Sequence, residues 1–204
     1  MEITKKVIYS GEGFDFTFEP IEDSISIKKT KNGYEVRYLT PDKYPENPFE
    51  NDEGLGNFYH WNNDREEFLK YCEALGYDHN TTEKIGKENP DVVKIDKYEH
   101  SQVYYSVEGE GYNCQWDTSH SWAVWLPNNC LLEDLKRFKT KASRRKRCIE
   151  LARQACEIFN QWANGEVYCI VKENFDTNKE QIDYDVVGGY YGYKEALKSL
   201  ETDI

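Results

Sequence analysis

The chain has 204 residues and a formal charge of −12 at pH 7, because 38 acidic residues outnumber 26 basic ones. A chain of this length is typical of one domain and buries enough surface to fold without a disulfide or metal. The negative charge argues against direct nucleic-acid binding, which needs a cationic surface. Aromatic residues make up 15% of the sequence, a share that excludes intrinsic disorder.

No apolar run approaches the ~18 residues of a membrane span, and the first residues lack the apolar region of a signal peptide. The sequence therefore predicts a cytoplasmic protein without membrane attachment. Its six cysteines are then expected to be reduced thiols rather than a disulfide framework. Neither CxxC nor HxxxH spacing occurs, so we predict no metal site and no cofactor.

The first forty residues predict strands. Residues 24–27 and 34–38 each alternate apolar and polar side chains, and Asn32-Gly33 separates the two runs. Asn-Gly between alternating runs is a strong signal for a hairpin. We therefore expect an N-terminal β-hairpin region over residues 1–40.

The next segment predicts a long ordered loop followed by a helix. Prolines and glycines break the pattern over residues 41–61. Asp64 and Glu67 then form a capping box, and the helix that begins there is expected to end at Gly76. Residues 77–99 predict mainly loop.

The second half of the chain contains the longest predicted helix, at about residues 142–163. Apolar side chains recur along it at spacings of four and three residues, which predicts one buried face: Cys148, Ala152, Ala155, Phe159 and Trp162. Strands are expected at 102–107, 122–126, 167–171 and 183–187, and shorter helices at 131–138 and 193–200. The sum is an α+β fold, a single domain over residues 1–204 with a mixed or antiparallel sheet and one long packed helix.

A basic run lies at residues 136–147, with eight Lys or Arg residues and no acid, which leaves 38 acids against 18 bases elsewhere. Positive charge at the start of a helix opposes the helix dipole. The run can neutralise the acidic body, within the chain or across a homodimer, or it can be a solvated face. Alternatively, Arg145 and Arg147 can bind phosphate, a nucleotide or nucleic acid at the helix N-terminus.

Reactive side chains are densest between Cys114 and His120. One hypothesis is a catalytic site in which Asp117 orients His120, and His120 acts as a base toward Cys114 or water. The interpretation we favour is a structural turn, in which Asp117 and Thr118 bond nearby amides and Trp116 anchors the loop in the core. Catalytic triads assemble from distant segments, so sequence neighbours are weak evidence for one.

Two other segments are candidates for recognition. The acidic loop at residues 51–56 contains Asp52 and Glu53 but lacks the ligand spacing of an EF-hand, so we expect a recognition loop or a solvated one. The segment 187–193 predicts a glycine-rich aromatic turn that leads into the last helix. Its Tyr190 and Tyr191 are expected to pack, or alternatively to form a stacking surface.

Five short boxes of sequence occur in a fixed order over about residues 41–193. They are Glu46-Asn47-Pro48 with Asp52 and Leu55-Gly56, then His60-Trp61, Trp116-Asp117-Thr118, Gly165-Glu166-Val167-Tyr168 and Gly189-Tyr190-Tyr191-Gly192. In this order the boxes resemble those of a family of small proteins encoded by bacteriophages and mobile elements. Thr118 stands where that family has Ser, Gly188 where it has Trp, and the Trp/His order is reversed. The resemblance implies a phage or mobile-element origin and a location in the cytoplasm of a bacterial host, and it implies no activity.

We therefore expect a non-enzymatic accessory protein that binds and inhibits a host nucleic-acid-handling or defence protein. An acidic, aromatic-rich surface can occupy a groove that normally binds nucleic acid. One alternative is a protein that binds a nucleotide or small ligand, and another is a hydrolase or transferase centred on Asp117, His120 and Cys114. The residues expected to bind are Asp52, Glu53, Trp61, Trp116, Asp117, Thr118, Tyr190, Tyr191, Arg145 and Arg147.

Overall fold

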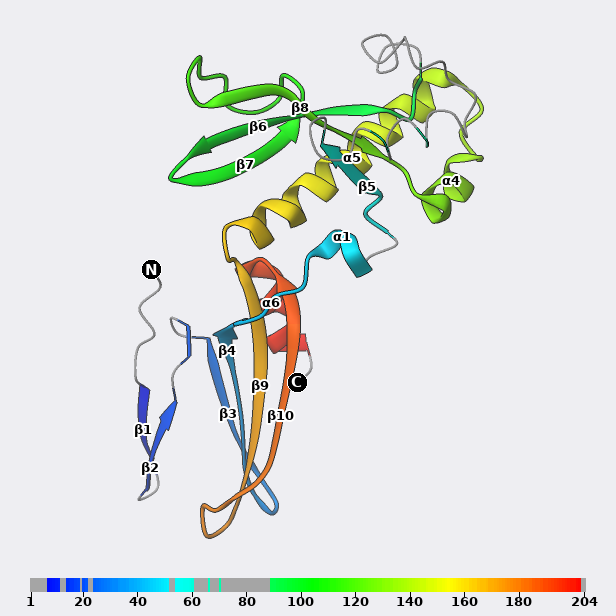
Figure 1. Ribbon diagram of the computed structural model, residues 1–204. Coiled ribbons are helices and arrows are strands. Elements are labelled where there is room, and N and C mark those ends of the chain that lie inside the picture. The colour runs from blue at the N-terminus through cyan, green and yellow to red at the C-terminus, as the bar shows by residue number, and fades with distance from the viewer. Residues whose placement is uncertain are drawn as a thin grey trace. The chain divides into compact units, whose positions relative to one another are not determined.

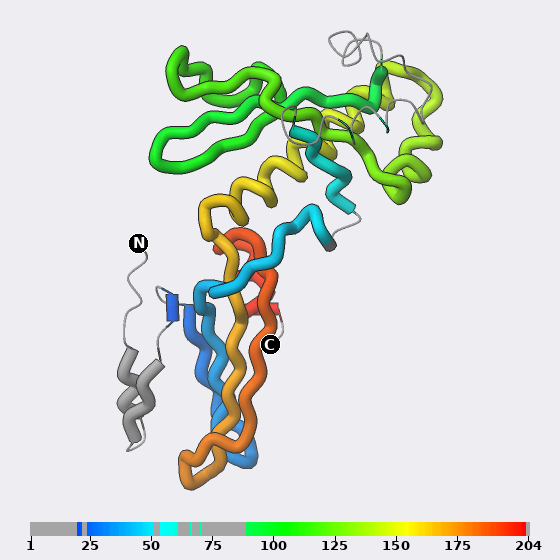
Figure 2. Tube along the Cα trace, viewed as in Figure 1, coloured from blue at the N-terminus to red at the C-terminus, as the bar shows by residue number. Residues whose placement is uncertain are grey.

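The computed structural model describes residues 7–11, 14–18, 20–21, 24–51, 54–60, 66, 70 and 89–202 (Figures 1 and 2). The described chain forms two compact units. Unit 1 comprises residues 1–46 and 165–204, and unit 2 comprises residues 47–164. The single domain expected over residues 1–204 stays a prediction. Of the helix expected at residues 64–76, the structure describes only Glu66 and Lys70, and both are helical.

Unit 1 is built on a four-stranded antiparallel sheet in the order β10-β9-β4-β3. Its strands are β3 (Ile25–Thr30), β4 (Gly33–Pro41), β9 (Val167–Asp176) and β10 (Gln181–Tyr191), and α6 (Tyr193–Thr202) follows β10. A separate antiparallel hairpin, β1 (Val7–Gly11) with β2 (Phe14–Phe18), lies near the N-terminus. Figure 2 shows the β3–β4 and β9–β10 turns at the same end of the sheet.

The predicted hairpin at residues 24–38 is confirmed. Thr30 pairs with Gly33, so the turn has two residues. Gly33 has a φ of 145°, and a Cβ atom there would lie 1.8 Å from the carbonyl oxygen of Phe175 on β9. Only glycine fits this position, because the conformation is strained for other residues and the neighbouring backbone fills the space.

The glycine-rich segment 187–193 continues a strand, so its prediction as a turn is wrong. β10 extends to Tyr191, with a register shift between Val187 and Tyr190. Gly189 takes a φ of 81° there, which lets the strand form a bulge and resume its pairing with β9. The packing interpretation fits Tyr190, which lies against the apolar cluster between the sheet and α6.

Unit 2 contains a second antiparallel sheet, in the order β5-β8-β6-β7. Its strands are β5 (Asn57–His60), β6 (Val93–His100), β7 (Gln102–Val107) and β8 (Thr118–Leu126). The helices whose bounds lie within the described residues are α1 (Pro48–Asn51), α4 (Asn129–Leu135) and α5 (Lys141–Ala163). The two antiparallel sheets and the long helix confirm the predicted α+β class.

Two loop predictions are wrong. The segment 41–61 contains α1 and β5, and the segment 77–99 ends in most of β6. Val93 and Ile95 are fully buried at alternate positions of β6, but Lys97 at the next position of this face interrupts the apolar alternation. β8 also begins at Thr118 rather than at residue 122, so part of the predicted 114–120 turn lies in a strand.

The long helix is confirmed. α5 begins after Thr140, whose side chain accepts a hydrogen bond from the amide of Ser143 at 3.1 Å. It ends before Gly165, where a φ of 73° stops the helix. Three residues of the predicted stripe are fully buried in the core of unit 2, namely Cys148, Ala152 and Ala155, and the other two, Phe159 and Trp162, are partly buried.

Asn160 on α5 and Asn164, which caps the end of this helix, cover the outer edge of β7. Asn160 accepts from the Tyr105 amide at 2.7 Å and donates to the Tyr105 carbonyl at 2.9 Å. One helical turn later, Asn164 does the same to Val103, at 3.0 and 2.7 Å. Four residues along a helix and two residues along a strand span nearly the same distance. The two asparagine side chains therefore make the hydrogen bonds that the backbone of a further strand beside β7 would make.

We expect Asn160→Ala to lower the free energy of unfolding of unit 2 by about 2 kcal/mol, because the variant leaves a buried amide and carbonyl of Tyr105 without partners. All five tryptophans belong to unit 2, so urea unfolding followed by tryptophan fluorescence measures this unit alone. Gln154→Ala, an exposed site on the same helix, is the control. Equal stability of the two variants would contradict the role given to Asn160.

Candidate functional site

The sheet of unit 2 carries an irregular pairing between β6 and β8. Ile95 pairs with Ala123 and Lys97 with Ser119, so the single residue Asp96 lies opposite three residues of β8. Ser121, at the centre of these three, has a φ of 49°. The extra residues form a bulge, a feature that turns side chains out of the regular alternation and is frequent next to functional sites.

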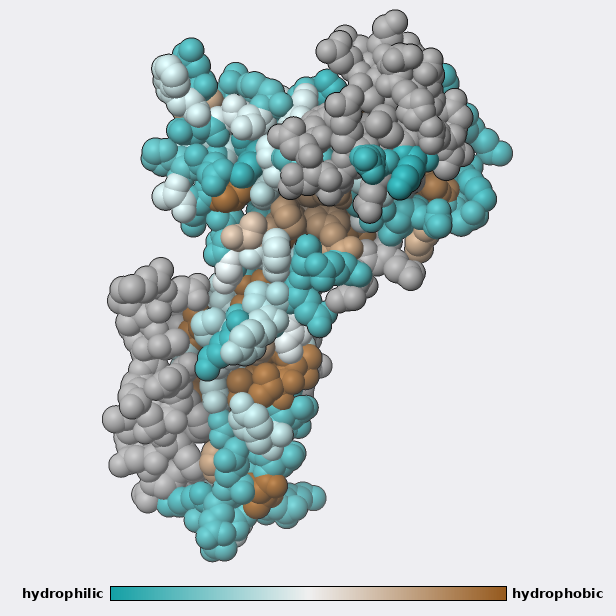
Figure 3. Space-filling model, viewed as in Figure 1, coloured by the Kyte–Doolittle hydropathy of each residue, from teal (hydrophilic) through white to brown (hydrophobic). Residues whose placement is uncertain are grey.

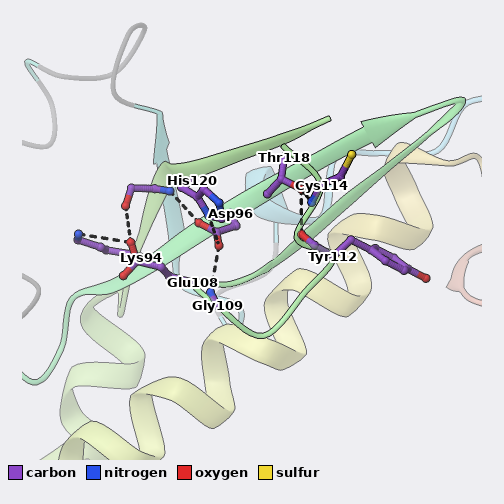
Figure 4. A network of polar contacts seen from close by, with 9 residues as sticks. Lys94, Asp96, Glu108, Gly109, Tyr112, Cys114, Thr118 and His120 are labelled. Carbon is purple, nitrogen blue, oxygen red and sulfur yellow. Dashed lines mark hydrogen bonds and ion pairs between the residues drawn. The ribbon is translucent and has the colours of Figure 1, made fainter. Parts of the chain in front are cut away.

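The buried carboxylate of Asp96 holds this bulge together (Figure 4). One oxygen accepts from the Ser121 amide at 2.7 Å, and the other accepts from the Gly109 amide at 3.0 Å. The second oxygen also lies 3.1 Å from Nδ1 of His120. Asp96 therefore fixes the bulge, fixes the turn after β7 and orients an imidazole that is 57% exposed.

An imidazole oriented by a buried carboxylate can act as a general base. The adjacent hydroxyl, that of Ser121, donates to Glu108 at 2.5 Å, and Glu108 also pairs with Lys94 at 3.5 Å. The hydroxyl is therefore directed to a carboxylate rather than to the imidazole, and the group is a polar network rather than a nucleophile with its base.

The predicted cluster at residues 114–120 is divided between two carboxylates. Asp117 accepts from the thiol of Cys114 at 3.4 Å and lies 3.3 Å from Nδ1 of His100. His120 instead contacts Asp96, as described above. Asp117 therefore contacts His100, whereas the sequence suggested a contact with His120.

The turn before β8 is held at its base by Thr118. Its hydroxyl accepts from the Cys114 amide at 3.0 Å and donates to the Tyr112 carbonyl at 2.9 Å. Its own amide donates to the Cys114 carbonyl at 3.0 Å. The expectation that Trp116 anchors this turn in the core is wrong, because Trp116 is 86% exposed. The turn is closed by backbone and hydroxyl bonds, so it needs no aromatic anchor.

Three tyrosine rings, those of Tyr98, Tyr104 and Tyr112, pack together at the base of this turn, where the Tyr112 carbonyl accepts from Thr118. We refer to these tyrosines, together with the exposed Trp116 of the turn itself, as the aromatic surface. Tyr98 and Tyr104 are direct partners on β6 and β7. The ring of Tyr112 lies 4.8 Å from that of Tyr98 and 5.7 Å from that of Tyr104. Partial burial and the nearby Asp117 carboxylate raise the pKa of Tyr98.

Sequence analysis missed three members of this group and also Asp96. The alternation from Val93 to Tyr98 could have identified β6, and with it the face that Asp96 and Tyr98 share. The proximity of Tyr112 to this face depends on Gly111, where a Cβ atom would lie 2.2 Å from the Ser106 hydroxyl. No pattern in the neighbouring sequence predicts this close approach of Gly111 to Ser106.

The basic run makes contacts within unit 2. Arg144 holds the buried Asp91 with two hydrogen bonds of 2.5 and 2.6 Å. Arg145 donates to the carbonyl of Val92, and burial lowers the pKa of its guanidinium. Arg147 pairs with Glu150 at 3.3 Å on the same helix. These contacts favour internal neutralisation among the three interpretations of the run.

The remaining predicted residues lie elsewhere. Tyr190 and Tyr191 belong to β10 of unit 1, where the Tyr191 hydroxyl donates to the Glu46 carbonyl at 2.8 Å. Asp52, Glu53 and Trp61 lie outside the described residues.

The described residues contain no group of three or more His, Cys, Asp and Glu side chains placed to hold a metal ion. Among the helices in the described ranges, none is long and apolar enough to cross a membrane. No protein-family model, curated protein or solved structure matches the chain. The function must therefore be inferred from the site itself.

Two buried thiols of α5 are expected to be unreactive. Burial raises the pKa of Cys148 to about 12 and also raises that of Cys156, whereas Cys130 is exposed. At pH 8 a thiol reagent should modify Cys130 in the folded protein, and Cys148 and Cys156 only after unfolding. Mass spectrometry of labelled peptides measures this, and rapid native labelling of Cys148 would contradict the packing of α5.

The raised pKa of Cys148 also predicts a loss of stability at alkaline pH. A thiol whose pKa is higher in the folded state than in the unfolded state stabilises the fold fully below the unfolded value of about 9. This stabilisation is lost as the pH rises from about 9 toward 12. Urea unfolding should show a smaller alkaline loss for Cys148→Ala than for the wild type, and identical slopes would contradict the prediction.

Proposed function

We propose that the protein is a non-enzymatic accessory protein that binds a partner protein through the aromatic surface of unit 2. The observation that carries this proposal is the position of Trp116, which is 86% exposed at the tip of a turn that Thr118 closes. An isolated protein rarely exposes a tryptophan so fully, and exposed aromatic clusters mark interaction sites. Trp and Tyr are also the residues that dominate binding energy at protein interfaces.

The turn that carries Trp116 is held by hydrogen bonds, and this also favours a role in binding. Binding costs less free energy when the contacting side chains are held before the partner arrives. Tyr112 packs against two neighbouring rings, and the turn that displays Trp116 has three hydrogen bonds at its base. The surface therefore resembles a preformed interface.

The charge of the chain suggests the class of partner. The net charge is −12. Glu99, near the end of β6, and Asp117, just before β8, lie beside the aromatic surface. A negatively charged protein is attracted to the basic grooves of proteins that handle nucleic acid. We propose that the partner is such a protein, a nucleic-acid-handling or defence protein of a bacterial host, and that the chain inhibits it by occupying its groove.

The test is affinity capture by the tagged full-length chain from a bacterial lysate, with duplex DNA as competitor. We expect stoichiometric capture of a nucleic-acid-handling protein that duplex DNA displaces, because both ligands bind the same groove. Trp116→Ala should remove the captured protein. If no protein is retained, or if DNA has no effect on its retention, the proposed inhibition is wrong.

A second function, binding of a nucleotide, is favoured by a pocket in unit 1. It has a volume of about 250 Å³, and its lining includes Arg37, Lys172 and Tyr190 together with one carboxylate, that of Asp185. Two cations beside an aromatic ring suit a phosphate and a base, although Glu35 already pairs with both cations. Calorimetry with ATP tests this alternative, since binding should weaken at least about tenfold in Lys172→Ala. Absence of heat with the wild type would exclude it.

A further inference from the structure

β10 forms one edge of the sheet in unit 1 (Figure 1). Residues 181–189 of this strand are all exposed, and its partner in the described sheet is β9. An exposed edge strand offers unpaired amides and carbonyls to any chain that can pair with it. In unit 2 the corresponding edge of β7 is covered by two asparagines, as described above.

Two backbone amides of β10 each donate a hydrogen bond to the side chain of the preceding residue. The Tyr184 amide donates to Asp183 at 3.0 Å, and the Val186 amide donates to Asp185 at 2.9 Å. Alternate residues of an antiparallel strand turn their amides away from the neighbouring strand. Tyr184 and Val186 are two residues apart, so both amides face the same side of β10. Since both donate to side chains of β10 itself rather than to β9, that side is the free edge. The acceptors of these two amides are exposed aspartate side chains. The backbone carbonyls of an added strand can replace the aspartates as acceptors.

The side chains of β10 differ between its two faces. Tyr184 and Val186 lie on one face, 58% and 41% exposed, and border an open groove of about 580 Å³ that Tyr38 and Val171 also line. Asp183 and Asp185 lie on the opposite face, because side chains alternate along a strand. Figure 3 shows apolar surface, in brown, over the region that β9 and β10 occupy in Figure 1.

We propose that the free edge of β10 binds an extended segment of a partner protein in which basic and apolar residues alternate. The segment adds a fifth strand to the sheet and accepts hydrogen bonds from the amides of Tyr184 and Val186. Its apolar side chains lie beside Tyr184 and Val186, and its basic side chains lie beside Asp183 and Asp185. This site lies in unit 1 and is independent of the aromatic surface of unit 2.

Charge complementarity selects this occupant over a second copy of the chain. Two copies paired through β10 would bring Asp183 and Asp185 of one copy toward the same residues of the other. Like charges on neighbouring strands are destabilising. A basic strand instead places a cation beside Asp183, and another beside Asp185, whose neighbour on the other side is Lys172 of β9.

The test uses the full-length chain and a short peptide of alternating lysine and valine, blocked at both ends. The control is the corresponding peptide of glutamate and valine. We expect the lysine peptide to bind and to shift the amide NMR signals of residues 182–187, and the glutamate peptide not to bind. Equal binding of both peptides, or shifts confined to residues outside β10, would overturn the proposal.

Two variants separate the contributions of the backbone and of charge. Val186→Pro removes one outward amide without removing a bond to β9, and it should abolish peptide binding. Asp183→Asn with Asp185→Asn should weaken binding about tenfold through the loss of two ion pairs. The control removes the same charge from α6, through Glu195→Gln with Glu201→Gln, and should leave affinity within about twofold.

The amide spectrum of each variant without peptide establishes that the sheet is intact. Unchanged affinity in both Val186→Pro and the double asparagine variant would overturn the proposal. Sedimentation without peptide adds one further outcome: a dimer that Val186→Pro abolishes would assign the edge to a second copy and would also overturn it.

Discussion

Replacement of Asp96 by alanine is expected to lower the free energy of unfolding of unit 2 by about 4 kcal/mol. The variant removes a buried charge-assisted acceptor and leaves the amides of Ser121 and Gly109 without a partner. Each such bond contributes about 1.5 to 3 kcal/mol. The bulge also holds Ser121 at a positive φ, a conformation that persists only while its surroundings impose it.

Two control variants identify the cause of this loss. Glu108→Ala removes the other carboxylate of the network, which is 43% exposed, and should cost about 1 kcal/mol or less. His120→Ala removes the imidazole and keeps both amide bonds, so it should also have a small effect. Urea unfolding monitored by tryptophan fluorescence measures all three variants. If Asp96→Ala is no less stable than Glu108→Ala, Asp96 does not hold the bulge.

The second large effect is expected at Asp91, where alanine should cost about 3 kcal/mol. Asp91 binds Arg144 through two hydrogen bonds, and the two side chains are only 10% and 24% exposed. Removal of one member of a buried pair leaves the other charge without compensation. The same variant also removes the acceptor of the Cys148 thiol.

The chain offers a matched control for burial. Arg153 and Glu110 form a pair with the same two-bond geometry, at 2.6 Å for each bond, but their side chains are 53% and 37% exposed. Ion pairs in contact with solvent contribute little to stability, so Glu110→Ala should change the unfolding midpoint far less than Asp91→Ala. Comparable losses in the two variants would show that burial does not set the cost.

The elements that could be predicted from sequence are those with a strong local pattern. α5 has a long apolar stripe with a cap at each end, and the β3–β4 hairpin has alternating runs around Asn-Gly. β6 was missed because its apolar alternation is short: after Val93 and Ile95, Lys97 occupies the next position of the same face. In the folded chain Asp96 is buried, because its carboxylate accepts hydrogen bonds from two backbone amides. From the sequence pattern alone, an aspartate at such a position is predicted to be exposed.

The candidate site was predicted only in part. The segment 114–120 does lie at a cluster of reactive and aromatic side chains, but pairing across the sheet decides which groups meet. His120 meets a carboxylate 24 residues away in sequence, through a bulge that has no local signal. Trp116 was expected inside the core because tryptophan is usually well buried, and its exposure is the feature that most strongly indicates binding.

The most direct test of the account is the affinity of the Trp116→Ala variant for the partner that affinity capture identifies, measured by calorimetry with purified proteins. The matched control is Tyr44→Ala, which removes an aromatic side chain of similar exposure, 89%, from unit 1. We predict that Trp116→Ala weakens binding at least about thirtyfold, the effect of a dominant interface residue, and that Tyr44→Ala stays within about twofold of the wild type. Equal affinities of the wild type and Trp116→Ala would contradict the assignment of the aromatic surface as the binding site.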